Sequence, residues 1–179
     1  MPKAIIPKII EKAKKIKLIL MDVDGVLTNG IVYYFEDGNI ARGFNVQDGM
    51  AIDLAHLANI QTGVISAKNS LSIKKRLQEL NIKYIYLGYE NKIDALEKII
   101  IESNINHQEI AYIGDDIIDI PVFKKVGLSI AVANATKLTK LAADYITYSK
   151  GGNGAIRESI EIILKSQNIF EKLIKKIIT

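Results

Sequence analysis

The sequence predicts a Rossmann-like, doubly wound α/β fold with a parallel sheet, and two observations support this prediction. Short runs of β-branched and aliphatic residues recur along the chain, and each run is closed by glycine, asparagine, aspartate or serine. Segments with the 3.6-residue apolar spacing of helices lie between these runs. Continuously apolar strands that alternate with helices are typical of a parallel sheet covered on both faces.

The predicted strands cover residues 17–21, 62–66, 84–87, 110–113, 128–132 and 145–147. The helices cover residues 49–58, 70–80, 92–103, 118–126, 136–143 and 154–167. One segment breaks the alternation, because two short apolar runs flank Asp37-Gly38-Asn39, a turn that accepts positive φ. We therefore expect a β-hairpin, about residues 31–44, which projects from the sheet just after the first strand.

A length of 179 residues with 49% apolar content fits one domain, so residues 1–179 are predicted to form a single domain with a helical tail at about 154–179. The tail carries Phe170, Leu173, Ile174 and Ile177 on one helical face, which we expect to pack on its own domain or on a partner subunit. The segments between the polar strand ends are filled by predicted elements, which leaves no room for an inserted lid of roughly 50 residues. We expect no cap domain.

Composition restricts the partners. The net charge is +4, and no stretch interleaves aromatic with basic residues, so we expect no nucleic-acid partner. The chain has no cysteine and two histidines, so a metal would be held mainly by oxygen ligands. No apolar run reaches the ~18 residues of a membrane helix, and the start lacks the apolar block of a signal peptide. We expect a cytoplasmic protein without a membrane partner.

Polar residues follow several of the predicted strands at their carboxyl ends, where open parallel sheets bind ligands. These residues are Asp22, Asp24 and Gly25 after the first strand, Ser66 after the second, Lys92 at the helix after the third, and Asp115, Asp116 and Asp119 after the fourth. Crowded carboxylates repel one another unless a cation lies between them, and all-oxygen coordination is the preference of Mg²⁺. The pattern predicts a magnesium site.

Two acidic residues spaced two apart at a strand end can divide the work of phosphoester hydrolysis. Asp22 would attack phosphorus, and Asp24 would protonate the leaving alkoxide and later deprotonate the attacking water. Ser66, Lys92 and backbone N–H groups near Gly25 could stabilise the charge on the phosphoryl oxygens. Asp115 would complete the metal site, and Asp119 could orient Lys92. Asp116 could instead cap the following helix.

The segments DVDGVLT and GDDIIDIP, with Ser66 and Lys92 between them in order, resemble the four motifs of the haloacid dehalogenase superfamily. In that superfamily a second aspartate two residues after the nucleophile accompanies phosphoester hydrolysis, so the resemblance implies that Asp24 marks a phosphatase. It also implies that Mg²⁺ is held by Asp22, the backbone carbonyl of Asp24 and Asp115.

From about residue 15 to residue 167, the chain further resembles the capless 3-deoxy-D-manno-octulosonate 8-phosphate phosphatase branch, through runs such as FNVQDGMAI, GYENKIDAL and GGNGAIRESIEIILKSQ. This resemblance implies an acidic sugar phosphate as substrate and a role in lipopolysaccharide sugar biosynthesis. It also implies a homotetramer in which the hairpins form a central barrel and a neighbouring chain helps to cover each active site. A second subunit would then exclude water in place of a cap.

The chain departs from the branch after Ser66, where Ala67-Lys68 replaces the usual Gly-Arg, and Thr136 replaces a histidine found in some relatives. Lysine is a point charge where arginine is a bidentate fork, so the departure bears on which sugar is bound. Arg157 could reach a phosphate or a neighbour's site, or lie on the surface. The run Gly151-Gly152-Asn153-Gly154 lacks the ending of a nucleotide-binding loop and is interpreted as a flexible entry to the last predicted helix.

Two alternatives remain open from the sequence. The first is a phosphatase acting on a nine-carbon 2-keto sugar acid 9-phosphate. The second is a receiver domain, which also phosphorylates an aspartate at a strand end with Mg²⁺ and a lysine. Receivers place their paired acids and their phosphorylated aspartate on different strands, and a receiver would not turn over an added phosphomonoester.

Overall fold

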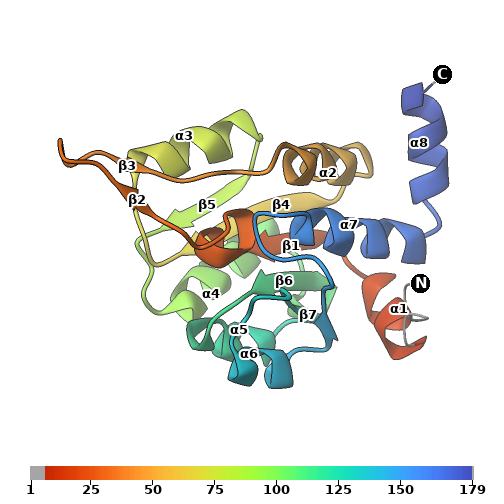
Figure 1. Cartoon of the computed structure of the whole chain (residues 1–179). Helices are drawn as coiled ribbons and strands as arrows, with labels where there is room; N and C mark the ends of the chain where they lie inside the picture. Colours follow the sequence, from red (N-terminus) through yellow and green to blue (C-terminus); the bar gives the residue numbers. More distant parts are fainter. Residues whose placement is uncertain (1–6, 179) are drawn as a thin grey trace.

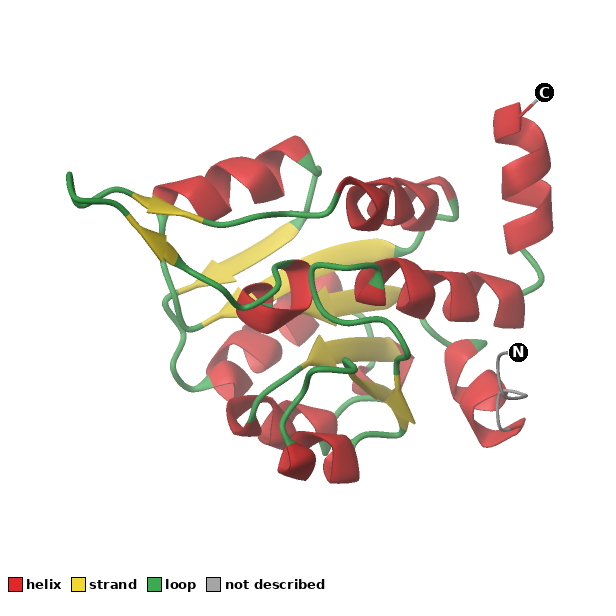
Figure 2. Ribbon diagram, in the orientation of Figure 1, coloured by secondary structure: helices red, strands yellow, loops and turns green. Residues whose placement is uncertain are grey.

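The computed structural model describes residues 7–178 and has a central parallel sheet between layers of helices (Figure 1, Figure 2). The six strands of the sheet lie in the order β5-β4-β1-β6-β7-β8, and all the pairs are parallel. Their bounds are β1 (Leu18–Met21), β4 (Gln61–Ser66), β5 (Tyr84–Leu87), β6 (Ile110–Gly114), β7 (Leu128–Ala131) and β8 (Tyr145–Ile146). The predicted fold class and each of the six predicted strands are confirmed.

Helices cover both faces of the sheet, as Figure 1 shows. On one face, α2 (Val46–Leu57) packs along α7 (Ala155–Ser166), which also contacts α1 (Pro7–Ala13). On the other face, α4 (Lys92–Ser103) contacts α5 (Ile120–Phe123), which contacts α6 (Lys137–Ala142). The helix α3 (Leu71–Glu79) connects β4 to β5. Because both faces are covered, the four residues of β1 are fully buried and need no polar alternation.

The strand order places the polar loops together. The strand β1 lies between β4 and β6. After β1, the chain adds β4 and β5 on one side of it, and it then adds β6, β7 and β8 on the other side. A crevice outside the carboxyl ends of the strands forms at such a reversal, and this is where open α/β sheets bind ligands. The loops after β1 and β6 carry the predicted acidic residues, and they therefore lie side by side.

The predicted hairpin projects away from the sheet, as Figure 2 shows. Its paired strands, β2 (Tyr33–Tyr34) and β3 (Ile40–Ala41), are shorter than predicted. Gly38 in the turn has φ +80°, which explains the glycine. The pairing is short because the hairpin has little of the chain to pack on: Tyr34 is 77% exposed and Phe35 is 55% exposed. An isolated antiparallel bridge between Thr28 and Phe44 closes its base.

The two ends of the described chain differ from the prediction in detail. The helix α1 is not among the predicted elements; it is only seven residues long, too short for a clear apolar period, and it buries Ile9 and Ala13. The tail is helical, as predicted, but it is divided at Asn168, which has φ +57°, into α7 and α8 (Phe170–Ile178). Residues 1–6 and Thr179, which the prediction of one domain includes, lie outside the described residues. Within residues 7–178, no helix is both long enough and apolar enough to span a bilayer.

Candidate active site

The loop after β1 places Asp22 at the edge of the sheet. The backbone N–H of Asp22 donates to the carbonyl of Ile113 at 3.0 Å, so the residue continues the pairing of β1 with β6. Its side chain is almost fully buried, and its Oδ1 accepts a hydrogen bond from the N–H of Val23 at 2.6 Å. The chain then turns through a single tight turn, η1 (Val23–Leu27), which the N–H of Thr28 closes by donating to the carbonyl of Val23. This turn fixes the direction of both carboxylates, Asp22 and Asp24.

Gly25 is required by close approach of the loop to Asp115. It has φ +89°, and a Cβ atom built at this position would lie 2.1 Å from Oδ2 of Asp115. Any larger residue would push this carboxylate away. The loop is held from behind by Asn134, whose Nδ2 donates to the carbonyl of Gly25 at 3.1 Å and whose Oδ1 accepts from the N–H of Gly151 at 2.6 Å.

The glycine run after β8 is part of this support. The N–H of Gly152 donates to the carbonyl of Val26 at 2.8 Å, and a Cβ atom at Gly151 would lie 1.7 Å from the carbonyl oxygen of Gly25. The run does lead into α7, whose N-cap is Gly154, as predicted, but the interpretation of the run as flexible does not agree with these contacts. The glycines permit backbone-to-backbone contact with the loop that carries Asp22, a requirement that sequence spacing cannot reveal.

Lys92 lies at the centre of a buried polar network. Its Nζ lies 2.8 Å from Oδ2 of Asp22, 2.6 Å from Oδ1 of Asp119 and 3.1 Å from the hydroxyl of Tyr112. Burial by itself would lower the pKa of Lys92, but the carboxylates of Asp22 and Asp119 outweigh it, so the pKa is raised and the lysine stays charged. Lys92 therefore acts as the buried counter-charge of Asp22.

Asp119 anchors this network from beneath. Its Oδ1 accepts from Lys92 and, at 2.8 Å, from the hydroxyl of Tyr112, while its Oδ2 accepts from the N–H groups of Asp115 and Asp116 at 2.9 and 3.2 Å. Four donors leave this carboxylate little capacity for a further ligand. Burial and the nearby carboxylates of Asp119 and Asp22 raise the pKa of Tyr112 well above its usual value, which keeps its hydroxyl protonated as a donor.

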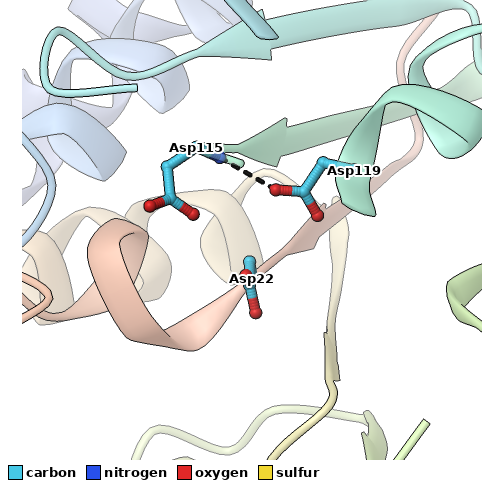
Figure 3. A group of neighbouring side chains, drawn as sticks. All are labelled: Asp22, Asp115 and Asp119. Atoms are coloured by element: carbon cyan, nitrogen blue, oxygen red, sulfur yellow. Dashed lines mark hydrogen bonds between the residues drawn. The ribbon is translucent and has the colours of Figure 1, made fainter. Parts of the chain in front are cut away.

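The acidic cluster fits a divalent cation. Carboxylate oxygens of Asp22, Asp115 and Asp119 lie within 4.8 Å of one another, and Figure 3 shows Asp115 and Asp119, which follow β6, beside Asp22 at the end of β1. Among the described residues, no donor contacts the Asp115 carboxylate. Burial, with the charges of Asp22 and Asp119, raises the pKa of Asp115 to about 7, and burial also raises that of Asp22 despite Lys92. Because four donors already occupy the Asp119 carboxylate, Asp22 and Asp115 are the carboxylates that would supply the oxygen ligands that Mg²⁺ prefers.

A cavity of about 170 Å³ opens at this edge of the sheet and is lined by Asp22, Asp24, Ser66, Ala67, Lys68, Asp115, Asp116 and Ile118. Ser66 is buried at the end of β4, and its Oγ accepts from the N–H of Lys68 at 3.1 Å. The side chain of Asp116 accepts from the N–H of Ile117 and caps the short helix that follows. The structure thus brings residues predicted from separate strand ends to one cavity.

Arg157 is the predicted site residue that lies away from this cavity and its buried network. Its Nε donates to Glu161 on its own helix at 2.5 Å, and its backbone N–H donates to the buried carboxylate of Asp48 at 2.9 Å. The contact with Asp48 ties the start of α7 to α2. In the isolated chain, Arg157 therefore belongs to the junction between α2 and α7.

Sequence reasoning missed three polar residues that contact the site, namely Arg42, Tyr112 and Asn134. Tyr112 lies inside a buried strand, where a tyrosine is expected to seek a partner for its hydroxyl, so a signal was present. Arg42 and Asn134 carry no such signal, because they lie in loops far from their partners in sequence. Arg42 contacts Asp24 across 18 residues, and Asn134 contacts Gly25 across 109.

The raised pKa values predict how pH and Mg²⁺ affect the stability of this protein. In the metal-free chain, Asp22 and Asp115 bind protons more readily when folded than when unfolded, so their contribution to the free energy of unfolding falls as pH rises from about 4 to about 7. Mg²⁺ must displace these protons, so its stabilising effect should increase over the same window, reaching about 2.7 kcal/mol at a hundredfold excess over Kd. Urea denaturation with Mg²⁺ and with a chelator, at pH 5.5 and 8, measures this.

The matched variant for this experiment is Asp115→Asn, which keeps the shape of the side chain and removes its charge. It should lose most of the Mg²⁺ effect at pH 8. An equal effect of Mg²⁺ at the two pH values in the original protein, or an undiminished effect in the variant, would contradict the assignment of this cluster as the metal site.

Comparisons with known proteins agree with the geometry of the site. Residues 78–160 match the family model of haloacid dehalogenase-like hydrolases. The 3-deoxy-D-manno-octulosonate 8-phosphate phosphatase KdsC of Salmonella typhimurium is 40% identical over 161 residues, which cover 90% of this chain and 86% of that protein. The corresponding phosphatase of Escherichia coli K12 is 40% identical over 159 residues, covering 89% of this chain and 85% of that protein.

Solved structures give the same relationship. The 3-deoxy-D-manno-octulosonate 8-phosphate phosphatase of Moraxella catarrhalis, in complex with a magnesium ion, a phosphate ion and 3-deoxy-D-manno-octulosonate, has a TM-score of 0.94 at 38% identity and covers 97% of this chain and 99% of that one. The enzyme of Yersinia pestis has a TM-score of 0.92 at 36% identity and covers 93% and 90%. This chain therefore belongs to the 3-deoxy-D-manno-octulosonate 8-phosphate phosphatase family of haloacid dehalogenase-like hydrolases.

Proposed function

We propose that this protein hydrolyses 3-deoxy-D-manno-octulosonate 8-phosphate, in lipopolysaccharide sugar biosynthesis, through an aspartyl-phosphate at Asp22. The observation that carries the proposal is the meeting of Asp22, Asp24, Ser66 and Asp115 around one cavity. Relatives about 40% identical over most of the chain are phosphatases of this sugar. The whole chain, residues 1–179, is proposed to work as one domain.

In the proposed first step, an oxygen of Asp22 forms a bond to phosphorus while the bond from phosphorus to the sugar oxygen breaks, and Asp24 gives that oxygen a proton. In the second step, water attacks the aspartyl-phosphate, Asp24 takes the proton of the water, and Asp22 and inorganic phosphate are released. Each step is balanced in atoms and charge, and the two steps together return Asp22 to its carboxylate form and Asp24 to its protonated form.

The remaining residues stabilise charge. Ser66 and the ammonium of Lys92 are proposed to donate to the phosphoryl oxygens, with backbone N–H groups near Gly25. The proposed Mg²⁺ ligands are Asp22, the backbone carbonyl of Asp24, and Asp115; when bound, the ion would neutralise charge on the phosphoryl group.

Three further residues have supporting roles. Asp119 holds Lys92 in place, and Asp116 caps the short helix that follows it. Lys68, exposed at the rim of the cavity, is proposed to contact the sugar acid.

A panel of phosphate esters tests the substrate. Release of inorganic phosphate is measured with 3-deoxy-D-manno-octulosonate 8-phosphate, a nine-carbon 2-keto sugar acid 9-phosphate and a neutral hexose 6-phosphate, each with Mg²⁺ and with a chelator. We expect the highest kcat/KM for the eight-carbon acid and negligible turnover without Mg²⁺. A higher value for the nine-carbon acid, which the replacement of Gly-Arg by Ala67-Lys68 makes the second candidate, would reassign the substrate; no turnover of any ester would refute the phosphatase.

We further propose that the protein is a homotetramer whose active sites are covered by neighbouring subunits. The hairpin exposes Ile31, Tyr33, Tyr34, Phe35 and Ile40, an apolar surface that a monomer would leave in water. The cavity, at about 170 Å³, has room for a phosphoryl group but not for the whole sugar, so a further surface is needed to enclose the substrate.

Light scattering on a sizing column gives the mass directly. The variant Tyr34→Lys should reduce the mass to that of smaller species, whereas Lys125→Gln, which alters an exposed ion pair with Glu97, should leave it unchanged. A monomeric original protein would contradict the tetramer. We also propose a cytoplasmic location, where charged sugar phosphates are retained, and cell fractionation tests it.

A further inference from the structure

The second acidic residue of the site has a partner that the proposed chemistry does not yet use. Arg42 follows β3 in the hairpin, and its Nε donates to Oδ1 of Asp24 at 2.8 Å. The side chain of Arg42 is only 7% exposed, whereas that of Asp24 is 27% exposed. Each of the two acidic residues of the loop therefore forms an ion pair with a different basic side chain: Asp22 pairs with Lys92, and Asp24 pairs with Arg42.

The contact with Arg42 restricts the orientation of the Asp24 side chain, which has few other contacts. Within the described residues, Arg42 is the one side-chain partner of Asp24, in contrast to Asp22, which contacts both Val23 and Lys92. Because Oδ1 of Asp24 accepts from Arg42, the other oxygen is left to exchange a proton. Asp24 lines the cavity, whereas Arg42 is not among its lining residues, so the ion pair connects the cavity to the hairpin.

The position of Arg42 is itself fixed by the base of the hairpin. Phe44, two residues further on, forms the bridge with Thr28 that ties the returning strand to the end of the loop carrying Asp24. The hydroxyl of Thr28 in turn accepts from the N–H of Gly25 at 3.3 Å. The guanidinium and the carboxylate are thus attached to the same small framework, which makes their relative placement reproducible.

We propose that Arg42 is a positioning residue that holds Asp24 in the orientation for proton transfer, and that the hairpin is thereby part of the catalytic apparatus. The inference rests on the proposed function, in which Asp24 serves the leaving group and then the attacking water. A proton donor misplaced by about 1 Å loses on the order of a hundredfold in rate. Only steps that need the proton should suffer when Arg42 is replaced.

The test compares leaving groups in the variant Arg42→Gln. An alkoxide leaving group, as in 3-deoxy-D-manno-octulosonate 8-phosphate, needs a proton, and kcat should fall roughly tenfold to a hundredfold while KM changes less than about threefold. The leaving group of 2,4-dinitrophenyl phosphate needs none, so the first turnover should release dinitrophenolate as a burst at about the original rate. Steady turnover of this ester should then be slow, because hydrolysis of the aspartyl-phosphate still needs Asp24.

Two further variants and one binding measurement complete the design. Arg42→Lys keeps the charge but not the direction of the donor, and it should restore part of kcat. Lys125→Gln removes a positive charge from an exposed ion pair and should change neither rate. Mg²⁺ affinity by calorimetry and the urea midpoint should stay close to the original in Arg42→Gln, which separates loss of positioning from loss of the metal site or of the fold.

The outcomes distinguish this inference from the function on which it rests. If Arg42→Gln slows the burst with the dinitrophenyl ester as much as turnover of the sugar phosphate, Arg42 acts on the structure of the whole site and the inference fails. If KM for the sugar phosphate rises while kcat holds, Arg42 binds substrate and the inference fails. If the original protein hydrolyses neither ester, the proposed function itself fails.

Discussion

Asp22→Asn is expected to abolish turnover, with kcat lower by on the order of 10⁴-fold or more, because the amide cannot form a bond to phosphorus. The fold should survive. The asparagine oxygen can still accept from the N–H of Val23, and Lys92 retains its ion pair with Asp119 at 2.6 Å. The variant loses one charged contact to Lys92, worth about 1–3 kcal/mol, but it also removes the buried charge whose desolvation raises the pKa of Asp22, so the two effects on the free energy of unfolding should largely offset each other at neutral pH.

Steady-state release of phosphate and urea denaturation measure the two effects separately. The matched control is Asp53→Asn on the exposed face of α2, which should leave both quantities unchanged. A covalent test is independent of rate: acid quenching of the original enzyme during turnover of a radiolabelled ester should trap label on the protein, and Asp22→Asn should trap none. Label in that variant, or retention of more than about one hundredth of the turnover, would assign the nucleophile elsewhere.

Lys92→Met is expected to have the largest effect on stability and also to remove activity. Methionine keeps an unbranched apolar stem but leaves the carboxylates of Asp22 and Asp119 facing each other without their shared cation. Removing one partner from a buried ionic network costs about 3–5 kcal/mol, because the remaining charges are left unpaired in a poorly solvated site. The cost should shrink in acid, since protonation of Asp22 removes one of the unpaired charges.

Urea denaturation in the presence of a chelator, at pH 5 and pH 8, checks this expectation. The control is Lys98→Met on the same helix, where the ammonium lies at the surface beside the hydroxyl of Tyr89 at 3.1 Å. Replacement of an exposed residue of this kind should change the free energy of unfolding by less than about 0.5 kcal/mol. A Lys92→Met protein within about 1 kcal/mol of the original at pH 8 would show that the buried network is not the support that its geometry indicates.

Much of the site could be predicted because it follows from strand ends. Asp22, Ser66 and Asp115 each come directly after or at the end of a buried strand, and parallel strands present their carboxyl ends at one edge of the sheet. Lys92 begins the helix after β5, so its place near that edge also follows from the alternation of strands and helices. The position of each of these residues depends only on one strand and the loop next to it, so it can be predicted from local sequence.

The contacts that hold these residues in place could not be predicted in the same way. Arg42 reaches Asp24 from the hairpin, Asn134 and Gly151 support Gly25 from the loops after β7 and β8, and each of these contacts joins segments distant in sequence. The glycine run illustrates the difference, because its composition suggests flexibility, whereas Gly151 and Gly152 lie against backbone that leaves no space for a side chain. The amino-acid composition of a segment indicates which backbone conformations it can adopt, but it does not indicate which other segments pack against it.

The sequence by itself determined the alternation of the six parallel strands with helices along the chain, the acidic and basic groups at the strand ends, and the class of chemistry that such groups perform. It could do so because apolar periodicity and turn residues act over a few neighbouring positions. Only the tertiary structure decided which of the carboxylates receive donors, that Lys92 is shared by Asp22 and Asp119, and that Arg42 pairs with Asp24. These pairings depend on packing between segments far apart in the chain. Because the pairs are buried, their hydrogen bonds and ion pairs are stronger than the same contacts in water.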